Sequence, residues 1–482
     1  MRIPDLLTWI GGVAEPSAVT LDSAEAIVNP NTGEVLTTAR ASSPAQVERA
    51  IAAATEAHAE GRWSALACDE RAAVLERFAQ ALDARADEIA WLDAINAGVP
   101  ISVTTLFASS AGDTVRGAVT HALALGDEHA LEAGDRDVRV RRVPWGPAAL
   151  ITPWNAPSAM ATKKLAYALA AGATVILKPS PASPFSAQLI LEAAAEAEFP
   201  AGVVSMVLGG SNVGAALTGD ARIAAISMTG STPAGRAIAA SAAPRFARLQ
   251  LELGSNNPAL VLSDADITYS ARELADAAMK LSGQWCEAPR HVFVMRDQHD
   301  ALVEALRHEL ATLVIGDSTD AATTLGPVAF AARKAELEAQ RDALVAAGAR
   351  ALTVGSVPAA GSFVAPTLIL GERLVPESEI FGPLLLIEPV DSPSDAIARA
   401  NSGHVGLAAY VFTRDLKLGR QLGQRLVAGE VKLNGTSVLD MAPGSEQSFF
   451  GTSGIGGHGD AALLQFFTGV QVIGSDIPGL PL

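Results

Sequence analysis

The clearest candidate for a nucleophile is Cys286, one of only two cysteines in the sequence. It lies in the segment Ser282-Gly-Gln-Trp-Cys-Glu-Ala-Pro289, between a predicted helix and a strand that we expect near Val292. A cysteine in such a place usually serves as a small buried apolar side chain. A thiol in a glycine-containing connection is, however, accessible to a small molecule, and this favours a reactive role for Cys286.

Two further side chains have the chemistry to assist a nucleophile. Glu252 lies in Leu249-Gln-Leu-Glu-Leu-Gly254, where alternation predicts a short strand with the carboxylate among leucines. It is either a solvated edge carboxylate or one whose pKa rises by desolvation toward the range of a general base. Asn155 follows Pro153-Trp154 in a predicted turn, where it either shapes the turn or donates to a developing oxyanion.

Two segments could bind an anion. Lys178-Pro-Ser180 follows a predicted strand, and Gly230-Ser-Thr-Pro-Ala-Gly235 links a strand to a helix. The carboxyl ends of parallel strands form the ligand crevice of an α/β sheet, and a helix N-terminus there attracts phosphate. The glycine segment lacks the dinucleotide pattern Gly-x-Gly-x-x-Gly, so by itself it is a weak indication.

The elements that position these residues alternate between strand and helix. From Ala148 to Leu262, short apolar runs alternate with alanine-rich helical stretches, and a second alternating block extends from Ala259 to Leu433. This pattern predicts an α/β fold with parallel sheets covered by helices on both faces. Two doubly wound domains fit better than one very wide sheet, and we expect the break between Leu251 and Pro258.

Two segments have the pattern of exposed ribbons. Asp135 to Arg142 alternates polar and apolar residues, and Gly469 to Leu482 begins as a strand and ends rich in proline and glycine. Edge ribbons of this kind need a partner, so we expect them to form oligomer contacts.

Composition excludes several classes of protein. The 482 residues are 49% hydrophobic and carry a net charge of −17 without a long basic run, so binding to nucleic acid or to an anionic membrane is not expected. The two cysteines and the scattered histidines provide no disulfide framework and no metal site. The N-terminus lacks a signal-peptide pattern and no apolar run reaches about 18 residues, so we expect a cytoplasmic protein.

Taken together, these motifs resemble the aldehyde dehydrogenase superfamily, in the NAD(P)-dependent, non-acylating form. The matching segments occur in the family's order over nearly the whole chain. They are Asn29-Pro-Asn-Thr-Gly33, Pro153-Trp-Asn155, Lys178-Pro-Ser180, Thr229-Gly-Ser-Thr232, Leu251-Glu-Leu-Gly254, Gly283-Gln-Trp-Cys286, Gly326-Pro327, Pro366-Thr367, Glu379-Ile-Phe-Gly-Pro383 and Ser453-Gly-Ile-Gly456.

The resemblance implies a role for each candidate residue. Cys286 would be the nucleophile, Glu252 the general base, and Asn155 an oxyanion donor together with the backbone N–H of Cys286. The implied reaction is oxidation of an aldehyde to a carboxylic acid through a thioester, with hydride transfer to NAD or NADP. The implied cofactor contacts are Trp154, Lys178, Ser180, Gly230, Ser231, Glu379 and Phe381.

The resemblance also implies a domain division. Residues 1–134 and 146–252 would form a Rossmann-like cofactor-binding domain, and residues 253–435 the catalytic domain. Residues 135–145 and 436–482 would supply oligomerisation strands and a C-terminal segment, in a homodimer or a homotetramer. The stretch from Thr436 to Phe449 is expected to border the substrate entrance.

Several positions depart from the family pattern. Ser255 stands where a second glycine is usual, and His291 stands where arginine is expected, with Arg290 one place early. Gly457 replaces the arginine of the C-terminal motif. Pro181 stands where an acidic residue often binds the ribose hydroxyls, so we expect NADP to be accepted at least as well as NAD.

Three residues are assigned to the substrate side: Lys163, Ala156 and Trp285. In the resembling family the position of Lys163 commonly holds a large aromatic residue facing the substrate tunnel, and semialdehyde-oxidising members place a basic residue there. Lysines on helices also commonly extend to solvent. If Lys163 faces the tunnel, beside the space left by Ala156, the substrate would carry an anionic far end, as a semialdehyde acid does.

Two alternatives stay open at this point. A CoA-acylating aldehyde dehydrogenase or acyl reductase would pass the thioester to another thiol, which the presence of Glu252 as a water-activating base disfavours. A catalytically silent structural or binding homologue is disfavoured because Cys286, Glu252 and Asn155 occur together.

Overall fold

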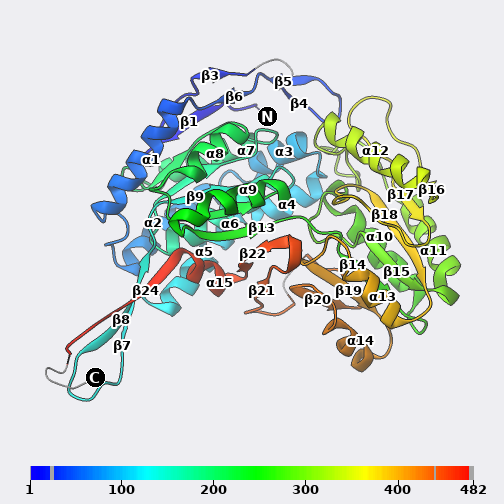
Figure 1. The fold of residues 1–482 in the computed structure, drawn as a ribbon. Coiled ribbons are helices and arrows are strands. Elements are labelled where there is room, and N and C mark those ends of the chain that lie inside the picture. Colours follow the sequence, from blue (N-terminus) through cyan, green and yellow to red (C-terminus); the bar gives the residue numbers. More distant parts are fainter. Residues whose placement is uncertain (1, 22–25, 439–440, 477–482) are drawn as a thin grey trace.

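The computed structural model describes residues 2–21, 26–438 and 441–476 of the chain. Two large sheets lie in its two halves, with helices packed around each (Figure 1). The α/β class predicted from strand–helix alternation is confirmed, because both sheets have a parallel centre with helical crossovers.

The first sheet has eight strands, with five parallel strands at its centre. The N-terminal hairpin, β1 with β2, pairs antiparallel with one edge of this parallel centre, and the short strand β22 pairs antiparallel with the other. The sequence pattern predicted neither. Its order is β2 (Val13–Pro16), β1 (Leu7–Ile10), β11 (Val204–Met206), β10 (Val175–Lys178), β9 (Ala148–Ile151), β12 (Ala225–Thr229), β13 (Arg248–Glu252) and β22 (Gly454–Ile455).

Helices cover this sheet on both faces because its strands are apolar on both sides. Leu177 packs into one buried cluster, and its neighbour Ile176 packs into another on the opposite face. The helices of this half are α1 (Pro44–Ala59), α2 (Cys68–Asp83), α3 (Ala86–Ala97), α4 (Ile101–Ser109), α5 (Ala111–Leu125), α6 (Pro157–Ala170), α7 (Phe185–Glu196), α8 (Ser211–Gly219), α9 (Thr232–Ala242) and α15 (Asp460–Phe467).

The second sheet has seven strands, and only its edge strand β16 is antiparallel. Its order is β16 (Arg350–Thr353), β17 (Thr367–Leu370), β18 (Leu384–Val390), β15 (His291–Met295), β14 (Pro258–Val261), β19 (Ala408–Phe412) and β20 (Glu430–Leu433). Its helices are α10 (Ile267–Met279), α11 (His299–Ala311), α12 (Ala331–Ala346), α13 (Pro393–Ala400) and α14 (Leu416–Gly423). The change of sheet falls between β13 and β14, within the predicted interval.

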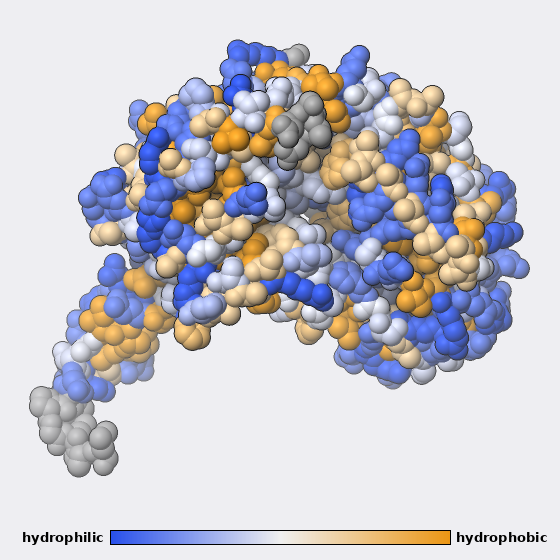
Figure 2. All heavy atoms as spheres, turned by 45° about the horizontal axis from the view of Figure 1, so that its top comes forward, coloured by the Kyte–Doolittle hydropathy of each residue, from blue (hydrophilic) through white to orange (hydrophobic). Residues whose placement is uncertain are grey.

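A third sheet of three strands projects from the body as an arm (Figure 1). It consists of β24 (Thr468–Gly474), β8 (Val138–Pro144) and β7 (Glu128–Ala130), so both ribbon-like segments of the sequence meet in it. Figure 2 shows hydrophobic side chains along this arm, and Val470, Val472 and Ile473 are exposed there. The last six residues of the predicted C-terminal ribbon, 477–482, lie outside the described residues.

Short two-stranded ribbons complete the fold. They pair β3 (Val19–Thr20) with β6 (Arg40–Ala41), β4 (Ile27–Val28) with β5 (Val35–Thr37), and β21 (Gln447–Ser448) with β23 (Gly457–His458). The β21–β23 ribbon matters most for the site, because its strand β21 lies in the stretch Thr436 to Phe449, which is expected to border the substrate entrance. Residues 439–440 of that stretch lie outside the described residues.

Candidate active site

Cys286 occupies a turn between the 3-10 helix Lys280–Gly283 and strand β15. The side-chain amide of Asn257 donates to the carbonyl oxygens of Cys286, at 2.8 Å, and Ala288, at 2.9 Å, which fixes the turn. Gly283 has φ +77°, and a Cβ there would stand 2.5 Å from the nitrogen of Pro383, so only glycine fits. The partly buried thiol is therefore held in one place.

Glu252 is the last residue of β13 and is buried. The parallel register pairs it with Thr229 of β12, whose hydroxyl donates to Glu252 Oε2 at 3.0 Å. The other oxygen, Oε1, accepts a hydrogen bond from the Cys286 thiol at 3.5 Å. The two residues, 34 positions apart in the sequence, thus meet as a thiol and its adjacent base.

Burial and nearby carboxylates favour the protonated form of the Cys286 thiol. Burial, and then the carboxylates of Glu252 and Glu287, raise the pKa of the Cys286 thiol well above its ordinary value. A thiol in this state needs a nearby proton acceptor to become a nucleophile, and Glu252 Oε1 is within hydrogen-bonding distance.

Asn155 lies just before α6, with its side chain buried. Its amide donates to the carbonyl oxygen of Gln284 at 2.7 Å, two residues before Cys286. The side-chain amide nitrogen carries two hydrogens. The second can donate to the oxyanion that forms when the sulfur bonds to a carbonyl carbon. Gln284 is anchored in turn, since Ala329 N donates to its side chain at 2.8 Å.

The predicted anion-binding residues lie at the carboxyl ends of two strands in the first sheet. Lys178 ends β10, with Ser180 two residues later, and Gly230 and Ser231 follow the end of β12 and lead into α9. Lys178 is buried, and this burial lowers the pKa of its ammonium group to about 8. The sheet therefore brings the two segments to one edge, as the sequence predicted.

This edge fits a nicotinamide dinucleotide. In the described part of the chain, no side chain caps the N-terminus of α8, which follows Gly210, or that of α9, which follows Ser231. The backbone N–H groups of both helices are therefore available to phosphate oxygens. Lys178 passes beside Gly214 of α8, where a Cβ would lie 3.5 Å from the lysine Cε. When bound, the cofactor would supply the hydride acceptor.

Two aromatic side chains predicted at the cofactor pocket meet across the two halves. The ring of Trp154 lies edge-to-face with that of Phe381, 5.3 Å between centroids, and with that of Phe330 at 5.2 Å. Glu379 lies two residues before Phe381 and accepts a hydrogen bond from Ser255 N at 3.1 Å. Burial raises the pKa of Glu379 to about 7.

The substrate-side residues divide into two groups. Ala156 and Trp285 join an apolar cluster that also contains Cys286 and the side chains of Val103 and Phe107 from α4. Helix α4 was not placed at the site by sequence analysis, because its Val and Phe carry no motif. This cluster forms an apolar wall beside the thiol.

The other group is the lysine pair of α6. Lys163 is half-buried, whereas Lys164 is buried and its ammonium donates to Ser227 Oγ at 2.7 Å and to Gln250 Oε1 at 3.3 Å. Ser227 and Gln250 lie one step below Thr229 and Glu252 on the same face of the sheet. Burial lowers the pKa of Lys164 to about 8.

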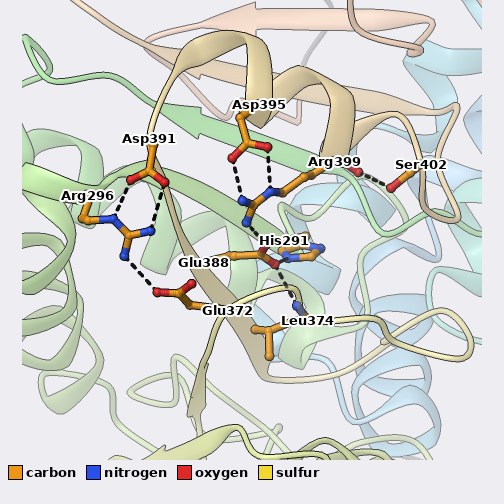
Figure 3. A network of polar contacts seen from close by, with 9 residues as sticks. All are labelled: His291, Arg296, Glu372, Leu374, Glu388, Asp391, Asp395, Arg399 and Ser402. Atoms are coloured by element: carbon orange, nitrogen blue, oxygen red, sulfur yellow. Dashed lines mark hydrogen bonds and ion pairs between the residues drawn. The ribbon is translucent and has the colours of Figure 1, made fainter.

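Two departures from the family pattern have structural partners. His291 Nε2 lies 3.0 Å from Glu388 Oε2, within the polar network of Figure 3. Arg290 is buried and donates to the carbonyl oxygens of Ala278, at 2.9 Å, and Gly283. Arg290 thus braces the turn that carries Cys286.

Sequence analysis assigned no role to several residues that hold the site together. They are Thr229, Lys164, Asn257, Gln284 and Arg290. Gln284 and Arg290 lie within four residues of Cys286, so proximity was the available signal. Thr229 and Lys164 come close to Glu252 only through strand pairing and helix packing.

Residues 2–21, 26–438 and 441–476 contain no group of three or more His, Cys, Asp or Glu side chains arranged to hold a metal ion. Within the same ranges, no helix is both long and apolar enough to cross a membrane.

Known proteins similar to this chain share one kind of chemistry. A profile of the Aldehyde dehydrogenase family matches residues 19–473. The 3,6-anhydro-alpha-L-galactose dehydrogenase of Streptomyces coelicolor is 35% identical, over 89% of this chain and 89% of that protein. The betaine aldehyde dehydrogenase of Sinorhizobium fredii is 33% identical, over 92% of each.

A solved structure that resembles this chain belongs to the same family. A variant of aldehyde dehydrogenase C from Pseudomonas syringae, in complex with NAD+ and octanal, superposes with a TM-score of 0.89. It is 32% identical and the match covers 98% of both chains.

Proposed function

The chain belongs to the aldehyde dehydrogenase family and oxidises an aldehyde to the carboxylic acid with NAD or NADP, and from this premise we propose that Cys286 is its nucleophile. The observation that carries the proposal is the 3.5 Å contact between the Cys286 thiol and Glu252 Oε1. A thiol held against a carboxylate is the arrangement expected of an activated nucleophile.

The proposed mechanism assigns each step to a residue. Glu252 takes the thiol proton and passes it to solvent, and the sulfur of Cys286 bonds to the aldehyde carbon, whose oxygen becomes an oxyanion. The Asn155 amide and the Cys286 backbone N–H donate to that oxyanion. A bound NAD or NADP would supply the hydride acceptor, and loss of the hydride would restore the C=O bond and leave a thioester on Cys286.

Hydrolysis completes the cycle. Glu252 removes a proton from water, the hydroxide adds to the thioester carbon, and the C–S bond breaks to release the acid and the Cys286 thiolate. Because Glu252 can activate water at this place, hydrolysis is favoured over acyl transfer to CoA.

One assay tests this function against its alternatives. The purified protein is mixed with a panel of aldehydes and with NAD or NADP, with and without CoA, and NAD(P)H formation is followed. We expect CoA-independent turnover. Strict dependence on CoA would indicate the acylating alternative, and no NAD(P)H with any aldehyde would indicate a silent homologue.

For the cofactor we propose that Lys178 and Ser180 contact the adenosine ribose, and Gly230 and Ser231 the pyrophosphate. Trp154, Glu379 and Phe381 would border the nicotinamide end. The support is their common place at the carboxyl edge of the first sheet and at its junction with the second half.

For the substrate we propose an aldehyde with an anionic far end, such as a semialdehyde acid. The support is the half-buried ammonium of Lys163 on α6, on the helix that follows Asn155 and Ala156. The apolar wall of Trp285 and Ala156 would contact the chain between the two ends.

We also propose the domain division 1–134 with 146–252, 253–435, and 135–145 with 436–482. The first sheet takes strands from residues 7–252 and the second from residues 258–433, which supports it. The final segment contributes β22 to the first sheet and β24 to the arm, so it binds the parts together.

The arm supports a proposal that the protein is a homodimer or a homotetramer. β24 is an edge strand with exposed Val470, Val472 and Ile473, and such an edge favours pairing with another copy. We propose a cytoplasmic location, since Cys68 and Cys286 are both free and a nucleophilic thiol needs a reducing compartment. Light scattering after gel filtration tests the oligomer.

A further inference from the structure

His404 lies in the loop between α13 and β19 of the second half, and it is half-buried. Each nitrogen of its ring has a hydroxyl partner. Nε2 lies 3.2 Å from Thr232 Oγ1 of α9, and Nδ1 lies 3.0 Å from Thr452 Oγ1 in the C-terminal segment. The ring therefore joins three segments that are far apart in the sequence.

The backbone of His404 also holds the linker between the two large sheets. Asn256 N donates to the carbonyl oxygen of His404 at 2.6 Å. The side chain of Asn256 donates to Ser378 O at 3.0 Å and accepts from Ile380 N at 2.8 Å, so the linker is itself anchored. Asn256 comes four residues after Glu252, and His404 is thus fixed to the connection that leaves the proposed base.

The partner of Nε2 begins the helix that we assign to the cofactor. Thr232 is the first residue of α9, directly after Ser231, and it is buried. The side chain of Ser231 makes no capping hydrogen bond, so the first N–H groups of α9 are available to a phosphate. Their direction depends on how this first turn is held, and His404 holds it from the opposite half of the molecule.

The ring of His404 is neutral near pH 7. Burial, and then the charge of Arg236 on α9, lower the pKa of His404, although the backbone of Gly254 acts in the opposite direction. A neutral imidazole donates from one nitrogen and accepts at the other, so at least one of the two threonine hydroxyls donates to the ring. A replacement side chain must therefore offer a donor and an acceptor at the right distance.

We propose that His404 is a positioning residue for the cofactor, which braces the N-terminus of α9 through Thr232 so that the helix presents its N–H groups to the pyrophosphate in one orientation. The inference rests on the proposed function, because it needs a dinucleotide at this edge of the first sheet. His404 acts on cofactor binding, and the steps at Cys286 proceed without it.

The first test is the Kd for NADH and NADPH, measured by fluorescence titration. His404→Leu keeps most of the volume of the side chain and removes both nitrogens. A neutral hydrogen bond contributes about three- to tenfold to an equilibrium constant, so the Kd should rise by that factor. At saturating NAD(P), kcat/KM for the aldehyde should stay within about twofold of the wild-type value.

Two amide variants separate bracing from a purely structural role. The amide of Gln extends about as far as Nε2, whereas that of Asn extends only about as far as Nδ1. His404→Gln should therefore restore the wild-type Kd, and His404→Asn should bind as weakly as His404→Leu. A role in stability alone would lower the free energy of unfolding in urea and leave the Kd equal in all three variants, which would contradict the inference.

Thr232→Val tests the route from His404 to the cofactor. It should raise the Kd by a similar factor, and the double variant with His404→Leu should bind no more weakly than either single variant. Fully additive losses would show that the two residues act independently, and would overturn the bracing role. If His404→Leu fails to fold, Thr232→Val and the two amide variants provide the same comparison.

Ser402→Ala is the matched control, because Ser402 lies on the same loop and its hydroxyl donates to Arg399 O at 2.8 Å. This variant should keep the wild-type Kd. If wild type binds NAD(P)H and oxidises aldehydes but His404→Leu binds with an unchanged Kd, the inference is wrong and the proposed function stands. If wild type binds neither NADH nor NADPH, both are wrong.

Discussion

The carboxyl group of Glu388 in the second sheet and those of Glu287 and Glu379 beside Cys286 differ in their cationic partners. In the second sheet, Glu388 accepts hydrogen bonds from Arg399 at 2.5 Å and from Leu374 N at 2.9 Å, with His291 3.0 Å away (Figure 3). Beside Cys286, Glu379 accepts a hydrogen bond from the neutral Ser255 N at 3.1 Å, and His458 Nε2 lies 4.0 Å from Glu287 Oε1.

The pKa values follow this difference. Burial acts to raise the pKa of Glu388, but hydrogen bonds from His291 and Arg399 lower it to about 2. Burial raises the pKa values of Glu287 and Glu379 to about 7. Cationic partners therefore keep one carboxylate charged in the second sheet, whereas burial without them gives carboxyl groups that exchange protons near neutral pH beside Cys286.

The largest effect should come from the thiol at the centre of the second group. Cys286→Ala removes the atom that bonds to the substrate, so turnover should fall by about 10⁴-fold or more. NAD(P) binding, followed by fluorescence, should be retained.

Cys68 provides the control, because it begins α2 far from the carboxyl groups of the site. Cys68→Ser should keep the activity of the wild-type enzyme. Full activity in Cys286→Ala would show that Cys286 is not the nucleophile, and would contradict a catalytic role for the carboxyl groups around it.

Glu252→Gln should slow the enzyme mainly in hydrolysis. Its carboxylate is one cause of the raised pKa of Cys286, so in the variant the thiol can lose its proton directly to solvent, whereas hydrolysis loses the base that activates water. Steady-state turnover should fall by about 10²- to 10⁴-fold.

Rapid mixing checks this prediction through the burst phase. One NAD(P)H per active site should form quickly, followed by slow turnover. Loss of the burst together with the steady state would show that Glu252 is indispensable before hydride transfer, and that solvent cannot replace it as acceptor of the thiol proton.

Glu388→Gln tests the structural half of the comparison. It leaves Arg399 and His291 beside a neutral amide, and breaking a buried ion pair costs about 3 kcal/mol in the free energy of unfolding. Urea denaturation measures this change. An unchanged free energy of unfolding would show that the network of Figure 3 does not stabilise the fold.

The same carboxylate predicts a response to acid. Its folded pKa of about 2 lies below the ordinary value of 4.5, so its contribution to stability is complete above pH 4.5 and is lost as the pH falls toward 2. Wild type should lose stability over this interval more steeply than Glu388→Gln, as measured by thermal unfolding at each pH.

Lys163→Ala should produce a selective loss. If the ammonium group binds the carboxylate at the far end of the substrate, its removal should lower kcat/KM for a semialdehyde acid relative to a neutral aldehyde of equal length. The loss should correspond to about 1–3 kcal/mol of transition-state free energy. Equal losses on both substrates, or a wild-type preference for the neutral aldehyde, would identify Lys163 as a surface lysine.

The smallest expected effect concerns the choice of cofactor. Pro181 offers no carboxylate to bind the ribose hydroxyls or repel a 2′-phosphate, and Lys178 lies nearby, so NADP should be used at least comparably to NAD. Steady-state kinetics with both cofactors checks this. A preference for NAD above about a hundredfold, roughly 2.8 kcal/mol, would contradict it.

Sequence analysis predicted the parallel strands and the place of the break between sheets because buried strands read as short apolar runs between helical stretches. It did not predict that β1, β2 and β22 add antiparallel edges, since these strands have no crossover helix that reveals their direction. Helices α3 and α4 were missed because both are apolar or small over most of their surface.

At the site, the candidates that carry a family motif were accessible to sequence analysis, whereas their supports were not. Asn257 lies outside the motifs, and Thr229 lies in one without an assigned role. Their contacts with the Cys286 turn and with Glu252 depend on chain reversal and strand pairing. Glu287 follows Cys286 directly in the sequence, but its burial among other charged groups depends on the packing of β19, β20 and β23.

The central claim is that the acyl group resides on Cys286, and trapping it there is the most direct test. Glu252→Gln is mixed with aldehyde and NAD(P), quenched in acid during the burst, digested and examined by mass spectrometry. We predict one acyl group per active site, on the peptide that contains Cys286. An acyl group on Cys68, or a full burst without any acylated peptide, would contradict the account.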